Sequence, residues 1–235
     1  MLPRLSPLLT GFPRVATSRK PPQDHRGTFV TLYHLTKAQD GDLLSFFCRM
    51  WGMRVTDLNQ GPVYGMETEE SRGDDRLAPI FNYDDVFGTV LNRFLVQAVS
   101  GVPLTVYGKG GQTRGYLNIK DTVACVELAL LYPASPGEYR VFNQFVETFS
   151  VNELADKVKE AGQEMNLKVK VQHIPNPRLE AEEHYYNPVH TGLMSLGLKP
   201  SYIDVTTLQE MLRMVQKYRE GIDPALIIPQ VRWSK

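Results

Sequence analysis

The stretch Met53-Arg54-Val55-Thr56-Asp57-Leu58-Asn59-Gln60-Gly61-Pro62-Val63-Tyr64-Gly65 decides the fold of this chain. Residues 53–58 alternate in polarity around Val55 and Thr56, which predicts a buried strand. Residues 59–65 contain glycine and proline and predict a loop directly after that strand. Open α/β sheets bind ligands at the carboxyl ends of their strands, so we expect this loop to lie at a binding site.

Helices are predicted on both sides of this strand. Residues 33–51 carry apolar side chains at helical spacing up to Gly52, and residues 86–99 do so up to the stop signals Gly101 and Pro103. Further strands are predicted at 104–107, 116–119, 138–145 and 168–174, and further helices at 122–132 with Asp121 as cap, 151–161 with the capping box Ser150–Glu153, 190–196 and 205–220. The segment 108–115 is predicted to be a loop and the tail irregular. Alternating strands and helices indicate the α/β class.

The overall composition argues for local binding sites. With 42% hydrophobic residues among 235, the chain is large enough for a sizeable core. Lys plus Arg equals Asp plus Glu at 26 each, so no global field favours a nucleic-acid partner. No apolar run approaches the length of a membrane span, and Cys48 and Cys125 are predicted to be small buried thiols.

The first 27 residues differ from the remainder. Residues 1–23 contain arginine, lysine, serine and proline but no acidic residue, a composition typical of an organellar transit peptide. An untargeted disordered leader is the alternative. We therefore expect a leader at 1–27, with a plastid location if it is a targeting signal and a cytoplasmic one otherwise, and the globular part of the chain at 28–235.

Tyr33 and Lys37 are the first candidate catalytic residues. Four residues apart on a helix, their side chains project from one face, and the ammonium group would lower the pKa of the phenol. An unperturbed tyrosine, with a pKa of about 10, is a poor base at neutral pH. A Tyr–Lys pair at this spacing is also common on a solvated helix face, so the pair alone leaves both interpretations open.

Two cationic positions could hold an anion. The loop 108–115 has four glycines and two cations, so its backbone amides could approach a phosphate while Arg114 neutralises it. An ordinary flexible hairpin is equally compatible with that composition. Arg178 stands in a proline-flanked turn, where a surface arginine is the commoner case. The cluster Glu180, Glu182, Glu183 and His184 lacks metal-site spacing, and no metal site is predicted.

Taken together, five stretches resemble the C-terminal portion of an extended short-chain dehydrogenase/reductase, the NAD-dependent epimerase/dehydratase family of sugar-nucleotide enzymes. They are YHLTKAQD, RVTDLNQGPVYG, NYDDVFGTVLNRFLVQAVSGVPLTVYGKGGQTRGYL, RVFNQFVETFSVNELADKV and PNPRLEAEEHYYN. The resemblance runs from about Tyr33 to the C-terminus. It implies an incomplete Rossmann-like fold that includes the C-terminal substrate-binding lobe.

The resemblance also implies residue roles. Tyr33 matches the family's catalytic base and Lys37 the lysine that holds the nicotinamide ribose, while Gln60 and Val63 match contacts to NAD. The residues that match the lining of the nucleotide-sugar pocket are Asn59, Thr89, Tyr107, Thr113, Arg114, Tyr116 and Arg178. The family's glycine-rich turn and the Ser or Thr of its catalytic triad lie upstream of the tyrosine and do not occur here, so we expect most of the NAD site to be absent from this chain.

Among the members of the family, the stretches most resemble the enzymes that form a sulfosugar from UDP-glucose and sulfite. The implied sequence oxidises C4, eliminates water across C5 and C6, adds sulfite at C6 and reduces C4 again, so that NAD is recycled. The alternatives are an inactive sugar-nucleotide-binding remnant and a UDP-sugar 4-epimerase or 4,6-dehydratase. UDP-glucose and sulfite are the expected small-molecule partners, with a homodimer as a further expectation.

Overall fold

The computed structural model describes residues 32–84, 87–176 and 188–228, and of Tyr33 and His34 it describes the backbone alone. The predicted leader 1–27, Arg178 and the cluster Glu180–His184 lie outside the described residues. The chain divides into two compact units, Met1–Leu43 and Leu44–Lys235.

Helix α1 (Leu32–Trp51) begins in the first unit and ends in the second. It ends at Gly52, which has a positive φ of 66° and donates its N–H to the carbonyl of Cys48 at 3.0 Å. Glycine adopts this left-handed conformation without steric cost, which is why it closes helices. The helix predicted at 33–51 is confirmed.

Strands β1 (Val55–Gln60) and β5 (Tyr139–Gln144) form a two-stranded parallel sheet in which Val55 lies opposite Tyr139 and Gln60 opposite Gln144. The prediction that the strand ends at Leu58 is wrong. Pairing with β5 carries it through Asn59 and Gln60, two polar residues that favour turns when no neighbouring strand supplies hydrogen bonds. The predicted strand at 138–145 is confirmed to within one residue at each end.

A second sheet contains β2 (Val63–Tyr64), β4 (Thr113–Asn118) and β6 (Glu147–Ser150), with β2 parallel and β6 antiparallel to β4. The sequence predicted a loop through Gly115 and no strand at β6. Instead Thr113 pairs with Ser150 and Arg114 with Phe149. Both errors have one cause, since the pairing joins segments far apart in the sequence and short strands leave little periodicity to detect.

Helix α3 (Ile119–Leu131) follows β4 directly. Its cap is Asn118, whose side-chain oxygen accepts from the backbone N–H of Lys120 at 3.0 Å. The prediction that Asp121 caps this helix is therefore wrong. Asp121 instead lies inside the first turn of α3 and is 3% exposed. Its carboxylate is therefore bound by groups outside this helix.

Helix α2 (Val90–Ser100) begins later than predicted. Thr89 caps it by accepting from the N–H of Asn92 at 3.2 Å, and a turn precedes it in which Gly88 donates to the carbonyl of Asp84. Phe87, expected on the apolar face, is 75% exposed. The predicted stop at Gly101 is confirmed by its positive φ of 73°.

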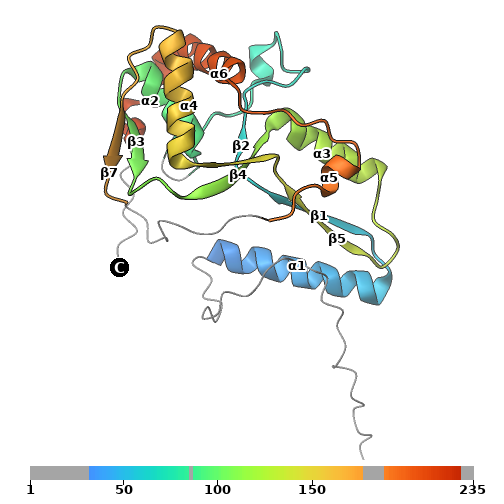
Figure 1. Ribbon diagram of the computed structural model, residues 1–235. Helices are drawn as coiled ribbons and strands as arrows, with labels where there is room; N and C mark the ends of the chain where they lie inside the picture. Colours follow the sequence, from blue (N-terminus) through green and yellow to red (C-terminus); the bar gives the residue numbers. More distant parts are fainter. Residues whose placement is uncertain (1–31, 85–86, 177–187, 229–235) are drawn as a thin grey trace, which may run out of the picture. The chain divides into compact units, whose positions relative to one another are not determined.

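The main core lies between three helices and a third sheet. Helices α2, α4 (Val151–Glu164) and α6 (Val205–Lys217) pack against one another beside β3 (Leu104–Tyr107), which pairs in parallel with β7 (Val171–Ile174) (Figure 1). Several side chains of this core are completely buried, and they include Leu91, Phe94, Leu95, Leu104, Val106, Leu154, Val158 and Leu212. Burial of such side chains is the main stabilising contribution to the fold, at roughly 1.5–3 kcal/mol each.

Helix α4 begins with the predicted capping box, in which Ser150 and Glu153 bond reciprocally to backbone N–H groups. Its predicted end before Gly162 is wrong, because the helix continues to Glu164. A Cβ atom at 162 would lie 2.6 Å from Cγ2 of Val169. Glycine is thus required for close packing at this position and does not act as a stop signal.

The remaining elements are short. They are η1 (Asp75–Leu77), α5 (Gly192–Ser195), η2 (Arg219–Gly221) and α7 (Pro224–Ile227). Helices α5 and α6 fall inside the predicted ranges 190–196 and 205–220, while η2 and α7 correct the prediction of an irregular tail. Cys48 and Cys125 are buried free thiols, as predicted.

Candidate functional site

The predicted site residues fall into the two structural units. Tyr33 and Lys37 belong to Met1–Leu43, and every other described candidate belongs to Leu44–Lys235. Tyr33 and Lys37 lie within α1, four residues apart, as is required if Tyr33 acts as a base beside Lys37. Lys37 forms an ion pair with Asp40, with 3.0 Å between Nζ and Oδ2 and with both side chains more than half exposed. Because an exposed pair contributes at most about 1 kcal/mol, it does not prevent the lysine from binding a ligand.

In the second unit, two predicted segments meet at a pair of glycines. A Cβ atom on Gly61 would lie 2.3 Å from the carbonyl oxygen of Gly115, and one on Gly115 would lie 2.4 Å from the ring of Phe145. This contact joins the end of β1 and the residues that follow it to β4. The two segments in which the sequence predicts site residues therefore lie in contact with each other.

The segment 188–192 reaches the same region. The ring of His190 lies 4.5 Å from that of Phe145, and Asn143 donates its side-chain amide to the carbonyl of Val189 at 2.7 Å. Asn59 and Asn143 are opposite each other in the β1–β5 register. Phe145 and His190 were not predicted, since only the tertiary fold brings them to the carboxyl ends of these strands.

Thr89 and Tyr107 are linked by an arginine that sequence reasoning missed. Arg93, on α2, is 6% exposed, and its guanidinium lies 4.6 Å from the centre of the Tyr107 ring. It donates to the carbonyl of Thr105 at 3.1 Å and to the hydroxyl of Tyr107 at 3.4 Å, while its backbone N–H donates to the carbonyl of Thr89. A planar guanidinium can stack on a ring and donate hydrogen bonds at once, so Arg93 fixes the orientation of Tyr107.

The glycine-rich loop 108–112 is anchored at both sides. Gly108 donates to the carbonyl of Ile174 at 2.9 Å and Gly110 to that of Tyr107 at 3.2 Å. The first backbone N–H groups of α4, at Val151 and Asn152, donate to carbonyls of the loop. Backbone hydrogen bonds therefore hold the loop on both sides, and the amides of Gly108 and Gly110 are already used inside the protein.

Side chains are a second source of contacts for an anion at this loop. Arg114 is half-buried and donates to the carbonyl of Thr113 at 2.9 Å. Tyr107 and Ile174 are the last residues of paired parallel strands, so residues 175–176 leave the sheet at the same end as the loop. Tyr116, predicted in the pocket lining, is 2% exposed and packs in the core near Phe149.

A buried polar cluster lies behind β2 and β4. Asp121 accepts from the N–H and the hydroxyl of Ser201 at 2.7 and 2.8 Å, Tyr64 donates to the carbonyl of Ser201, and Glu147 accepts from the N–H of Ile203. Burial raises the pKa of Asp121 and of Glu147, and it also raises the pKa of the Tyr64 phenol. These groups hold the segment that precedes α6 against the second sheet.

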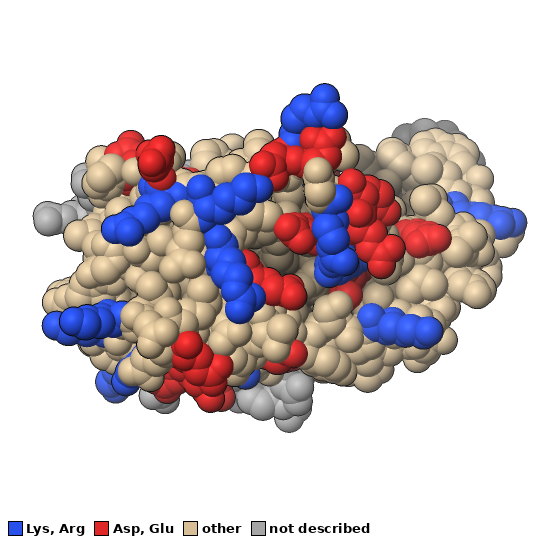
Figure 2. All heavy atoms as spheres, turned by 90° about the horizontal axis from the view of Figure 1, so that it is seen from above, with Lys and Arg blue, Asp and Glu red and all other residues tan. Residues whose placement is uncertain are grey.

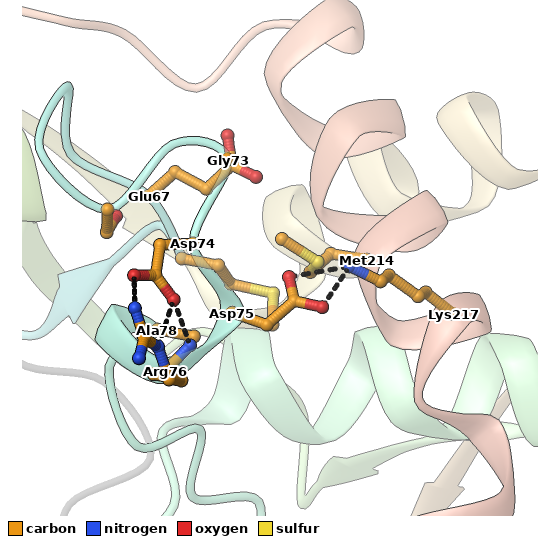
Figure 3. Close-up of a pocket in the computed structure, with 10 residues that line it drawn as sticks. Glu67, Gly73, Asp74, Asp75, Arg76, Ala78, Met214 and Lys217 are labelled. Atoms are coloured by element: carbon orange, nitrogen blue, oxygen red, sulfur yellow. Dashed lines mark hydrogen bonds and ion pairs between the residues drawn. The ribbon is translucent and has the colours of Figure 1, made fainter.

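Two cavities of the described residues lie away from the predicted site. One of about 380 Å³ is lined by the segment 66–78 and by Met214 and Lys217 of α6. Asp74 pairs with Arg76 and Asp75 with Lys217 across it, each at 2.7 Å (Figure 3). Figure 2 shows basic and acidic side chains around a hollow on the face viewed from above. Because these charges already neutralise each other, we assign no ligand to this cavity.

Two kinds of feature do not occur among the described residues. No helix among them is long and apolar enough to cross a membrane. No group of three or more His, Cys, Asp or Glu side chains among them is arranged to hold a metal ion.

Solved structures identify the fold. The UDP-glucose 4-epimerase of Thermus thermophilus in complex with NAD aligns with a TM-score of 0.58 and 22% identity, covering 81% of this chain and 54% of that one. The UDP-glucose 4-epimerase of Thermotoga maritima with UDP-glucose aligns with a TM-score of 0.62 and 20% identity, covering 80% and 54%. The chain therefore has part of the Rossmann-like fold of the NAD-dependent epimerases and dehydratases, as predicted.

Sequence comparison is more specific. No family model matches the chain. The chain is 54% identical over 205 residues to the chloroplastic UDP-sulfoquinovose synthase of Spinacia oleracea and 44% identical over 207 residues to the UDP-sulfoquinovose synthase of Sulfolobus acidocaldarius. Each match covers 87% of this chain, and 42% and 52% of the respective relative. The chain is thus related to the C-terminal portion of UDP-sulfoquinovose synthases and spans about half their length.

Proposed function

We propose that this chain carries the substrate-binding part of a UDP-sulfoquinovose synthase. The observation that carries the proposal is the 54% identity over 205 residues with the spinach enzyme. The corresponding reaction joins UDP-glucose and sulfite to give UDP-sulfoquinovose and water. C4 is oxidised, water leaves across C5 and C6, sulfite adds at C6, and C4 is reduced, so the overall change is redox-neutral.

In this proposal the first unit supplies the proton acceptor. Tyr33 accepts the proton of the sugar 4-hydroxyl, and Lys37, one helical turn away, supports the phenolate and holds the nicotinamide ribose. The support for this pair is that both residues lie in one helix, four positions apart. Gln60 and Val63 complete the cofactor contacts from the chain that follows Leu58. NAD, when bound, would accept and return the hydride.

The second unit binds the nucleotide sugar. Arg114 and Arg178 neutralise the diphosphate, since a guanidinium can donate two parallel hydrogen bonds to phosphate oxygens. Asn59 contacts the sugar. The remaining pocket lining is formed by Thr89, Tyr107, Thr113 and Tyr116. Of these, Tyr116 is so fully buried that its role is to support the wall of the pocket from behind.

For location, we propose a plastid, because the spinach relative is chloroplastic and the leader has a transit-peptide composition.

Calorimetric titration with UDP-glucose and with NAD tests the proposal. We expect weak UDP-glucose binding, reduced about tenfold or more in Arg114→Gln, and no measurable NAD binding by the chain alone. Arg213→Gln removes an exposed charge on α6 and should bind like the parent. Absence of UDP-glucose binding would contradict the proposed site, and tight NAD binding would contradict the division of labour between this chain and the remainder of the enzyme.

A further inference from the structure

Strand β3 has another strand on one edge and a helix on the other. All four of its residues are buried, and among the described strands it pairs only with β7. On the β7 side, Leu104 donates its backbone N–H to the carbonyl of Lys170 at 2.7 Å. Gly108, just after the strand, donates in the same direction to Ile174 at 2.9 Å. The N–H of Thr105 points to the opposite edge, where it meets a side chain of α2.

Gln97 of α2 supplies hydrogen bonds that a second neighbouring strand would otherwise give to this edge. Its side chain is completely buried. Its Oε1 accepts from the backbone N–H of Thr105 at 2.9 Å, and its Nε2 donates to the hydroxyl of Thr105 at 2.8 Å. A buried backbone N–H without a partner is costly. The position of β3 on α2 therefore depends on this one side chain.

The same amide also holds the short helix α7. Nε2 of Gln97 donates to the carbonyl of Ile227, the last residue of α7, at 3.0 Å. Ile227 is 5% exposed and belongs to the main core. At the start of α7, the N–H of Asp223 donates to the hydroxyl of Tyr83 at 2.8 Å. Gln97 thus joins two segments that are far apart in the sequence, β3 and α7.

This connection leads to the predicted pocket. Tyr107, which the sequence places in the pocket lining, is the last residue of β3 and lies two positions after Thr105. A primary amide has two N–H donors, and both donors of Gln97 have acceptors here. If Ile227 moved away, one donor would be left unpaired inside the core, which favours reorientation of the amide away from Thr105. Movement of α7 would therefore disturb the strand that carries Tyr107.

We propose that Gln97 is a positioning residue that couples the packing of α7 to β3, and that this coupling sets the affinity of the pocket at Tyr107 for the uridine nucleotide. The inference rests on the proposed function. Gln97 acts through Thr105 and Tyr107, and a state in which α7 leaves the core binds the nucleotide more weakly. Because such coupling is reciprocal, bound nucleotide also holds α7 more firmly on the core.

Calorimetric titration of the full chain with UDP at 10 °C tests the role of Gln97, with folding of each variant verified by circular dichroism. Gln97→Met keeps the length of the side chain and removes its three hydrogen bonds. We expect the Kd for UDP to rise about fivefold or more, the usual lower range of a coupling between two sites. Gln216→Met, at an exposed glutamine on α6, should bind UDP like the parent. A purely structural role of Gln97 would lower stability and leave this Kd unchanged.

A second substitution tests the connection to α7. Ile227→Asp places a carboxylate in the core and should displace α7, so we expect the Kd for UDP to rise about fivefold or more. In the Gln97→Met background the same change should add less than about twofold, because the connection is already broken. Leu226→Asp, at an exposed position of the same helix, should leave the Kd unchanged. Ile227→Ala serves the same comparison if Ile227→Asp does not fold.

Hydrogen exchange measures the coupling in the opposite direction. UDP should slow exchange of the α7 amides in the parent and not in Gln97→Met. Equal slowing in both proteins, additive effects of the two substitutions, or an unchanged Kd in folded Gln97→Met would overturn the inference. A parent that binds no UDP would contradict the proposed function, whereas a parent that binds UDP with a Kd insensitive to Gln97→Met would contradict the role of Gln97 alone.

Discussion

Gly61 packs directly against the backbone of Gly115, and a Cβ atom at 61 would lie 2.3 Å from the Gly115 carbonyl oxygen. The clash would involve backbone, which cannot move away as a side chain could. This contact brings the residues after β1 to β4, so the geometry of the proposed pocket depends on it.

We expect Gly61→Ala to destabilise the protein by about 1–3 kcal/mol, the usual range for an overpacked site. Urea unfolding followed by circular dichroism measures the change. Gly221→Ala is a matched control, because a Cβ atom at 221 would meet open space. Equal stability of the two variants would contradict the close contact between residues 61 and 115.

The same region illustrates what the sequence could predict. The strand after Met53 and the glycine-rich segments were recognised, because they depend on local composition. The end of β1 was not, because Asn59 and Gln60 become strand residues only through pairing with β5. For the loop around Gly110 the sequence leaves a phosphate-binding loop and an ordinary flexible hairpin equally open, because the anchors of the loop come from β7 and α4, more than thirty residues away in the sequence.

Buried polar residues were the other main omission. Arg93 interrupts an apolar helix face, and its role depends on Tyr107, which α2 contacts only in the folded state. Asp121 is a residue type that favours helix caps, but the cap of α3 is Asn118, and Asp121 accepts hydrogen bonds from Ser201 instead. Local capping rules cannot discriminate between two suitable side chains three residues apart when a distant backbone group competes for one of them.

Asp121 should make stability depend on pH. Burial raises its pKa above the ordinary 3.8, so the folded state holds the proton more tightly than the unfolded state. Stability from this group therefore falls as pH rises from about the unfolded value through the raised folded value. Hydrogen bonds from Ser201 and the charge of Lys120 oppose the shift without cancelling it.

We expect the stability of Asp121→Asn relative to the parent to increase as pH rises through this window, because asparagine does not titrate. Its amide oxygen can accept from the Ser201 N–H, and its amide nitrogen can donate to the Ser201 hydroxyl. Urea unfolding at a series of pH values from 3 to 8 provides the comparison. Asp156→Asn removes an exposed carboxylate of α4 as a control. A constant difference between Asp121→Asn and the parent would show that Asp121 titrates equally in both states.

Tyr33→Phe separates proton transfer from binding. In a form of the protein that turns over UDP-glucose and sulfite, we expect this variant to lose turnover by a factor of about 100 to 10,000, the usual contribution of a general base. The Kd for UDP-glucose should stay within about twofold, because the phenyl ring retains its volume. Steady-state kinetics and calorimetry give the two values. Retained turnover would show that another group accepts the proton.

Arg93→Lys tests whether the buried guanidinium positions Tyr107. Lysine keeps the charge but lacks the planar fork that stacks on the ring and donates to Thr105 and Tyr107 together. We expect a loss of about 1–3 kcal/mol in unfolding free energy, the cost of breaking buried hydrogen bonds to a charged group. Arg213→Lys, at an exposed site on α6, should be neutral.

A purely structural role for Arg93 would change stability alone. If Arg93 also orients Tyr107 for the nucleotide, the Kd for UDP-glucose should rise at a temperature where the variant is fully folded, and the Kd for Arg213→Lys should not. Calorimetry at 10 °C, with folding verified by circular dichroism, distinguishes these cases. An unchanged Kd would show that Arg93 does not act on the nucleotide through Tyr107, and would confine its role to the packing of α2 on β3. Within the described part of the chain, Tyr107 is the only predicted pocket residue that the Arg93 guanidinium contacts.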